Sequence, residues 1–138
     1  YRVHQRVATK YNHGRTLLIG DAAHLNNPLG GLGMNSGIHD AWNLCEKLVE
    51  ILNPTRIKGR NYANALLETF DRQRRTTMNN FIQAQTIQNK RMMEEGTEEF
   101  LGAEWERLNN LHKDDELRYE FLLKQSMTQS VRDAESIS

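Results

Sequence analysis

Hydrophobic and polar positions divide the chain into a short strand-forming start and a long helical remainder. Residues 1–11 alternate weakly with a period of two, and the apolar run 16–19 predicts a short buried strand. Residues 38–52 carry apolar side chains at helical spacing, which predicts an amphipathic helix with Asn35 or Ser36 capping its start. The apolar stripe of this helix consists of Ile38, Ala41, Trp42, Cys45, Leu48, Val49 and Leu52.

Downstream of Asn53-Pro54, which ends this helix, the pattern is helical almost throughout. A second helix is predicted over about residues 61–92, and its Arg72, Arg74 and Arg75 are expected on a solvated or ion-paired face. Two shorter helical patterns follow, and the polar end from Ser130 is expected to fray.

These patterns predict a chain that is mainly α-helical, with one or two short strands at its N-terminal end. We divide it into residues 1–54, which hold the strands, a glycine-rich loop and the first helix, and residues 55–138, a helical region. Its 138 residues suffice for one domain with a modest core, and it begins at Tyr1 rather than at a methionine. We therefore expect a piece of a longer protein.

Composition excludes some classes of function. The chain has 18 basic and 18 acidic residues, so its zero net charge gives no electrostatic case for a nucleic-acid partner or a membrane surface. The single cysteine, Cys45, excludes an internal disulfide and suits a reducing compartment, so a cytoplasmic location is expected. No apolar run approaches the ~18 residues of a membrane-spanning helix.

A glycine-rich loop precedes the first helix. Gly30, Gly31 and Gly33 permit positive φ angles and a close backbone approach to a ligand. The helix that follows directly would present the backbone amides of Met34 and Asn35 as unpaired donors at its positive end. The loop lacks the lysine of a P-loop and the third glycine of a dinucleotide fingerprint. This arrangement favours a polar, phosphate-bearing or anionic cofactor.

Asp21 directly follows the predicted strand. Its carboxylate could accept hydrogen bonds from the hydroxyl groups of a ligand, as a sugar-like chain would supply. The spacing is equally compatible with an aspartate that caps a turn or satisfies loop amides.

Other candidate residues have simpler interpretations. No pair of histidines has the spacing of a metal site, so no metal is expected. We interpret His24 as a structural hydrogen-bonding residue behind the loop, and Cys45, Trp42 and Trp105 as packing residues.

Several segments together resemble one family. They are GRTLLIGDAAH from residue 14, PLGGLGMN from Pro28, GIHDAWNL from Gly37 and LLETFDRQRR from Leu66. This series is similar to the second flavin motif, and to the segment beyond it, of the single-component FAD-dependent aromatic-ring hydroxylases. These are flavoprotein monooxygenases of the p-hydroxybenzoate and phenol hydroxylase type. Asn27 stands where many members have a proline, which implies a slightly less rigid loop, and Gln73 stands where glutamate is usual.

The resemblance implies a fold, a reaction and roles for residues. The parent fold would be an α/β FAD-binding fold of the glutathione-reductase type, of which this chain is the C-terminal part. Asp21 would bind the ribityl hydroxyls of FAD, and the loop containing Pro28, Gly30 and Gly33 would lie against the isoalloxazine ring. The amides of Met34 and Asn35 would hold the flavin C2 carbonyl. NAD(P)H would reduce FAD, and a flavin C4a-hydroperoxide formed with O2 would hydroxylate a phenol-like substrate, with no catalytic side chain from this chain.

The resemblance also implies what is missing. The first glycine fingerprint and the middle motif of such enzymes do not occur here, so the isolated chain is expected to bind FAD poorly, to be inactive and to expose apolar surface on its first helix. A homodimer is compatible with the family. Two other functions stay open on the sequence: a non-catalytic interaction module or pseudo-enzyme, and an FAD-dependent epoxidase or reductase of the same fold.

Overall fold

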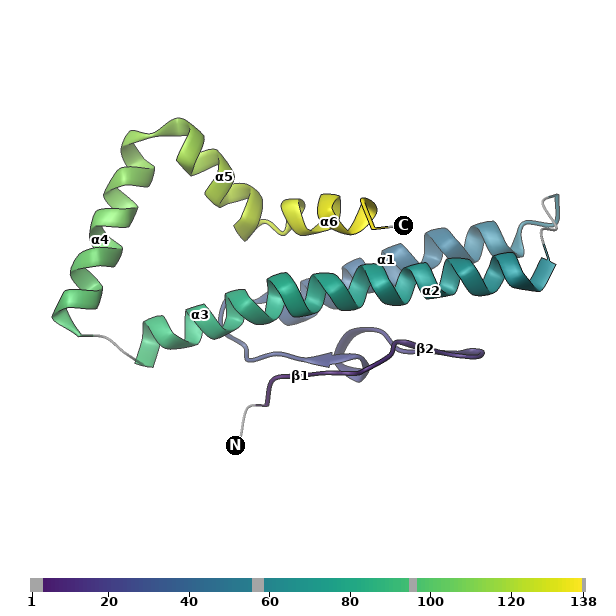
Figure 1. Ribbon diagram of the computed structural model, residues 1–138. Helices are drawn as coiled ribbons and strands as arrows, with labels where there is room; N and C mark the ends of the chain where they lie inside the picture. The colour runs from purple at the N-terminus through teal and green to yellow at the C-terminus, as the bar shows by residue number, and fades with distance from the viewer. Residues whose placement is uncertain (1–3, 56–58, 95–96, 138) are drawn as a thin grey trace.

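The computed structural model describes residues 4–55, 59–94 and 97–137, and Figure 1 shows long helices with short strands along one side. The N-terminal elements are β1 (Arg6–Val7), β2 (Asn12–His13), β3 (Thr16–Leu17), a 3-10 turn η1 (Gly20–Ala22) and β4 (His24–Leu25). The helices are α1 (Leu32–Leu52), α2 (Gly59–Thr77), a π-helical turn η2 (Met78–Ile82), α3 (Gln83–Glu94), α4 (Glu98–Lys113), α5 (Asp115–Gln125) and α6 (Thr128–Glu135). The mainly helical architecture with short N-terminal strands is confirmed.

The strands form two separate antiparallel pairs. β1 pairs with β4, and β2 pairs with β3 across a turn in which Gly14 has a φ of 61°. The buried strand predicted over residues 16–19 is wrong in its extent and burial, because the strand covers only two residues and Ile19 is 38% exposed. Within the described residues this hairpin has no further neighbouring strand, so its side chains stay partly accessible.

Helices α2 and α3 form one continuous rod through the π-helical turn, and α1 lies beside it (Figure 1). Thr77 and Gln83 at the ends of η2 both have right-handed helical φ and ψ angles, so the turn does not break the rod. α4 leaves the end of α3, and α5 and α6 return toward α2 (Figure 1). The predicted second helix is confirmed over most of its length.

Two hydrophobic clusters hold the described residues together. The first consists of Tyr11, Ala23, Leu44 and Phe70, and the second of Leu32, Met78, Ile82 and Met127. Both clusters combine side chains from before and after residue 54. The division of the chain at residue 54 therefore stays a prediction about roles, since packing joins the two parts.

Helix α1 faces the rest of the chain with its less apolar side. Its buried residues are Leu32, Ser36, Asp40 and Leu44, spaced four apart. Most of the predicted apolar stripe points outward, since Ile38, Trp42, Val49 and Leu52 are between 56 and 74% exposed, whereas Leu48 packs against the first cluster. This confirms the expected exposed apolar surface on the first helix.

Three residues interpreted as packing residues are also exposed. Cys45 is accessible, Trp42 is 70% exposed and Trp105 is 68% exposed. Their interpretation as core residues is wrong for this chain, because no described segment covers the outer faces of α1 and α4 at these positions.

The C-terminal end is packed rather than frayed. Met127 has a φ of 61° and is buried, and α6 follows it and lies against α2. Ser130 and Ala134 are 1% and 2% exposed, because small side chains let α6 approach α2 closely. The expectation of fraying is wrong, since small and hydroxyl side chains do the packing and leave no apolar pattern.

Candidate functional site

Helix α1 begins earlier than the sequence predicts. Its N-cap is Gly31, with a φ of 66°, and Gly30 before it has a φ of 94°. Positive φ is thus confirmed at two of the three loop glycines and is wrong for Gly33, which is already helical. The predicted caps act differently, because Asn35 Nδ2 donates to the Gly31 carbonyl at 3.1 Å and Ser36 Oγ donates to the Leu32 carbonyl at 2.6 Å.

Because helix α1 begins at Leu32, its unpaired backbone donors lie closer to the loop than the sequence predicts. In a helix capped at Gly31, the amides of Leu32, Gly33 and Met34 have no acceptor inside the helix, whereas the Asn35 amide closes the first turn. Met34 is 75% exposed at this end. The positive end of α1 therefore offers donors centred on Gly33 and Met34, and the predicted flavin contact of the Asn35 amide stays a prediction.

Asp21 lies on η1, which packs against the first turns of α1. Gly20 and Gly37 meet backbone to backbone, because a Cβ atom on Gly37 would lie 3.2 Å from the Gly20 Cα. Asp21 is exposed and makes no hydrogen bond to any described residue. Its carboxylate is therefore free to accept from a ligand, and the alternative in which it caps the turn finds no support in these contacts.

A buried polar cluster fixes η1 on the helices. The Asp40 carboxylate accepts hydrogen bonds from the Gly20 amide at 3.0 Å, from His24 Nε2 at 2.7 Å and from Arg74 Nε at 2.7 Å. Its side chain and that of His24 are fully buried, and Arg74 is 2% exposed. Burial alone would raise the pKa of Asp40, but the His24 hydrogen bond, the Arg74 charge and the Gly20 amide hold that pKa below the ordinary value of an aspartic acid.

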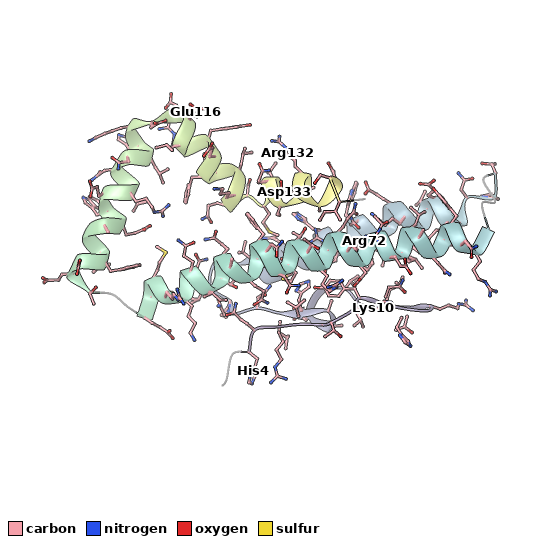
Figure 2. The ribbon with its side chains drawn as sticks, viewed as in Figure 1. His4, Lys10, Arg72, Glu116, Arg132 and Asp133 are labelled. Atoms are coloured by element: carbon pink, nitrogen blue, oxygen red, sulfur yellow. The ribbon has the colours of Figure 1, made fainter. Side chains whose placement is uncertain are left out.

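This cluster supports two predictions. His24 is a structural hydrogen-bonding residue behind the loop, as predicted. The ion-paired alternative is confirmed for Arg74, whose ion pair is buried, and for Arg75, which pairs with Asp71, while Arg72 is exposed on α2 (Figure 2).

Sequence reasoning missed the structural role of Asp40. The usable signal is a charged residue eight positions after Leu32, on the side of the helix opposite the apolar stripe. Gln73, where glutamate is usual in the family, makes neutral contacts instead of an ion pair. Its Oε1 accepts from Asn43 Nδ2 at 3.0 Å and its Nε2 donates to the Ile137 carbonyl at 2.9 Å.

The loop before α1 borders a cavity. The cavity has a volume of about 360 Å³, and Gln5, Asn27, Pro28, Leu29, Lys90, Met93 and Glu94 line it. A larger cavity of about 610 Å³ lies between α3, α4 and α5, but none of the predicted cofactor residues lines it. The residues predicted from the sequence therefore converge on η1, the loop and the start of α1, and not on this larger cavity.

The described residues lack two further kinds of feature. Residues 4–55, 59–94 and 97–137 hold no group of three or more histidine, cysteine, aspartate or glutamate side chains that could bind a metal ion. Among the helices described, none is long and apolar enough to cross a membrane.

A family model described as an FAD binding domain matches residues 1–85. This match spans most of the chain and includes η1, the glycine-rich loop and α1. The chain belongs to this family of FAD-binding domains.

Relatives and a solved structure agree with this assignment. The chain is 52% identical over 52 residues to para-nitrophenol 4-monooxygenase of Pseudomonas sp. strain WBC-3, covering 38% of this chain and 13% of that protein. It is 41% identical over 75 residues to 6-hydroxy-3-succinoylpyridine 3-monooxygenase HspB of Pseudomonas putida, covering 54% and 18%. The crystal structure of p-nitrophenol 4-monooxygenase PnpA from Pseudomonas putida DLL-E4 matches with a TM-score of 0.78 and 30% identity, over 95% of this chain and 32% of that one.

The chain spans less than a fifth of the length of these two relatives and about a third of the solved chain. The family resemblance predicted from the motifs is confirmed, as is the position of this chain within an FAD-dependent fold.

Proposed function

We propose that this chain is the C-terminal part of an FAD-dependent monooxygenase that uses NAD(P)H and O2 to hydroxylate an aromatic, phenol-like substrate. The observation that carries the proposal is the position of the exposed Asp21 carboxylate, which has no hydrogen-bond partner among the described residues, beside the start of α1, where Gly20 and Gly37 meet. The relatives are named as monooxygenases and hydroxylases, and three of the names specify nitrophenol or hydroxyphenyl substrates.

The residues present fit FAD in three ways. The Asp21 carboxylate has no hydrogen-bond partner among the described residues, so it can accept hydrogen bonds from the ribityl hydroxyls. Gly30 and Gly31, whose positive φ angles favour glycine, carry no side chain, so the loop backbone can lie flat against a ring. The unpaired amides at the start of α1 suit a carbonyl oxygen that carries negative charge.

The contribution of this chain is binding and electrostatics. FAD would supply the redox chemistry with NAD(P)H and O2 when bound. The amides of Gly33 and Met34 and the dipole of α1 would stabilise negative charge on a bound C2 carbonyl edge by up to ~2 kcal/mol. The Asn35 amide stays a proposed further contact, which it would share with the hydrogen bond that closes the first turn of α1.

This chain would supply only part of the proposed FAD site, and segments outside these 138 residues would supply the remainder. Asp21 would orient the sugar chain, while the loop containing Pro28 would cover one face of the ring and exclude water from it. No side chain of this chain is assigned a proton-transfer role. NAD(P)H, O2 and a homodimeric assembly belong to the proposal for the whole protein.

The test uses the protein expressed from its whole reading frame. Purified protein should retain FAD through dialysis and should oxidise NAD(P)H with O2 in the presence of a phenol, with a hydroxylated product seen by mass spectrometry. Protein that carries no FAD would refute the proposal. Protein that holds FAD but forms an epoxide, or that only reduces its substrate, would assign it to another activity of the same fold.

A further inference from the structure

The segment that contains Pro28 is held by helix α3. Asn27 is 4% exposed, and its Oδ1 accepts a hydrogen bond from the Leu29 amide at 3.0 Å. Its Nδ2 donates to the carbonyl of Thr86 on α3 at 3.0 Å. One side chain therefore both shapes the turn around Pro28 and ties it to a helix almost 60 residues later.

A second amide on α3 holds the other end of the same segment. Asn89 Nδ2 donates to the Leu29 carbonyl at 3.3 Å, and Gln85 Nε2 donates to Asn89 Oδ1 at 3.0 Å, which orients the Asn89 amide. A Cβ atom on Gly30 would lie 2.4 Å from Asn89 Nδ2. Only a glycine leaves room for this amide, so the loop and α3 fit each other closely at this point.

We propose that Asn27 and Asn89 are positioning residues. Their hydrogen bonds connect the loop containing Pro28 to α3 and so hold this loop against the flavin ring. This inference rests on the proposed function. It gives a role to a residue of α3, Asn89, that lies beyond residues 1–85 matched by the FAD-binding family.

The hydrogen bonds of the Asn27 and Asn89 amides compensate for the loss of loop rigidity that is expected at Asn27. The sequence implies a softer loop because a proline is absent there, but the two amides restrain the same segment through the carbonyls of Leu29 and Thr86. Thr86 is fully buried and its Oγ1 donates to the Ile82 carbonyl at 3.0 Å, so the anchor itself is fixed. Movement of the loop away from α3 would therefore break both hydrogen bonds.

The expected consequence concerns the fate of oxygen. In the productive reaction, NAD(P)H, a proton, O2 and the phenol give NAD(P)+, water and the hydroxylated phenol. If a loosened loop admits water to the ring, NAD(P)H, a proton and O2 give NAD(P)+ and hydrogen peroxide, and the phenol is left unchanged. Position of the loop should therefore control the yield of product for each NAD(P)H consumed.

The experiment compares Asn89→Ala and Asn27→Asp in the FAD-loaded protein expressed from its whole reading frame. Asn27→Asp keeps the acceptor for the Leu29 amide but removes the donor to Thr86. Gln88→Ala is the matched control, since Gln88 is an exposed amide on the same helix. The measurements are hydroxylated product and hydrogen peroxide per NAD(P)H, with a phenol as substrate, and the absorbance spectrum of the bound FAD.

We expect Asn89→Ala to lower product per NAD(P)H by about tenfold, less than the ~100-fold that a 1 Å misplacement of reacting groups costs. Hydrogen peroxide should rise to match, the flavin spectrum should shift, and Gln88→Ala should behave as wild type. If Asn89→Ala does not fold, the yield of hydroxylated product per NAD(P)H measured for Asn27→Asp tests the proposal instead.

The outcomes separate the two proposals. Wild-type protein without FAD overturns the proposed function and this inference with it. Wild-type protein that holds FAD, with Asn89→Ala and Asn27→Asp equal to Gln88→Ala in spectrum and in product yield, overturns the positioning role alone.

Discussion

Replacing Asp40 by asparagine tests how the Asp21 turn is held in place. The substitution keeps the shape of the side chain but removes its charge, which leaves the guanidinium of Arg74 buried at 2% exposure without its counter-charge. Removing one partner of a buried ion pair costs about 3–5 kcal/mol. Because folded domains are stable by only about 5–15 kcal/mol, Asp40→Asn should remove a large part of the free energy of unfolding.

The assay is urea unfolding at pH 7, followed by the helical circular dichroism signal, on the protein that contains this chain. Asp115→Asn is the matched control, because Asp115 forms a surface ion pair with Arg118 and its side chain is 91% exposed. The control should change the free energy of unfolding by less than about 0.5 kcal/mol. A cost below about 1 kcal/mol for Asp40→Asn would refute the assignment of this buried cluster as the anchor of η1.

The pH dependence gives an independent check. Burial acts to raise the pKa of Asp40, but its hydrogen bonds and the charge of Arg74 lower that pKa overall. A carboxyl group whose pKa is lowered by folding stabilises the fold above its unfolded pKa of about 4, and this contribution is lost as the pH falls through the folded pKa. The difference between wild type and Asp40→Asn should therefore be full at pH 7 and shrink below pH 4. A difference that is constant from pH 7 to pH 3 would contradict the charged state assigned to Asp40.

The remaining predictions concern the cofactor and the exposed helix face. Asp21→Ala should weaken FAD binding by about 1.5–3 kcal/mol, the scale of a lost hydrogen bond to a charged group, and unchanged FAD retention on dialysis would reject its role. Gly37→Val should also weaken FAD binding, because its Cβ would lie 3.2 Å from the Gly20 backbone and push η1 away. Gly33→Val should leave the fold in place, since a Cβ there meets no described atom within 4 Å, yet lower FAD affinity if the ring lies over the loop; a normal flavin spectrum would count against that placement. The 138-residue chain alone should self-associate in sedimentation experiments, and Trp42→Glu, which places a charge on the exposed stripe, should reduce the association; a monomeric wild-type chain would contradict this.

Much of the fold followed from the sequence because helical periodicity is a local property. Leu66, Leu67 and Phe70 stand at helical spacing on the second helix, and Phe70 is fully buried. The ordered series of residue types around Asp21 and the loop glycines identifies the family.

The errors arose where burial depends on partners distant in sequence. Asn35 and Ser36 have the side chains of helix caps, yet the helix starts at Leu32, because the glycine at Gly31 adopts the left-handed conformation that ends the loop. Ser130 and Ala134 carry no apolar signal, yet both are buried, because close packing of α6 on α2 needs small side chains.

Asp40 shows why residues proposed to bind a cofactor can be predicted from the sequence more easily than the residues that support them. A charged residue on a helix is usually solvated, and its place opposite the apolar stripe does not reveal which groups it contacts. Its partners Gly20, His24 and Arg74 lie 20, 16 and 34 residues away, so only the folded chain brings them together.

The two faces of α1 together explain how so short a chain keeps the geometry of the proposed site. The inward face buries Ser36 and Asp40, whose contacts are polar and directional, and these fix η1 and the start of the helix relative to each other. The outward face carries the apolar stripe with Trp42 and Val49, each 70% exposed. Polar contacts specify position, while apolar area supplies most of the stabilising free energy. The described residues therefore fix η1 relative to the start of α1, as the proposed site requires, through polar contacts on the inward face of the helix.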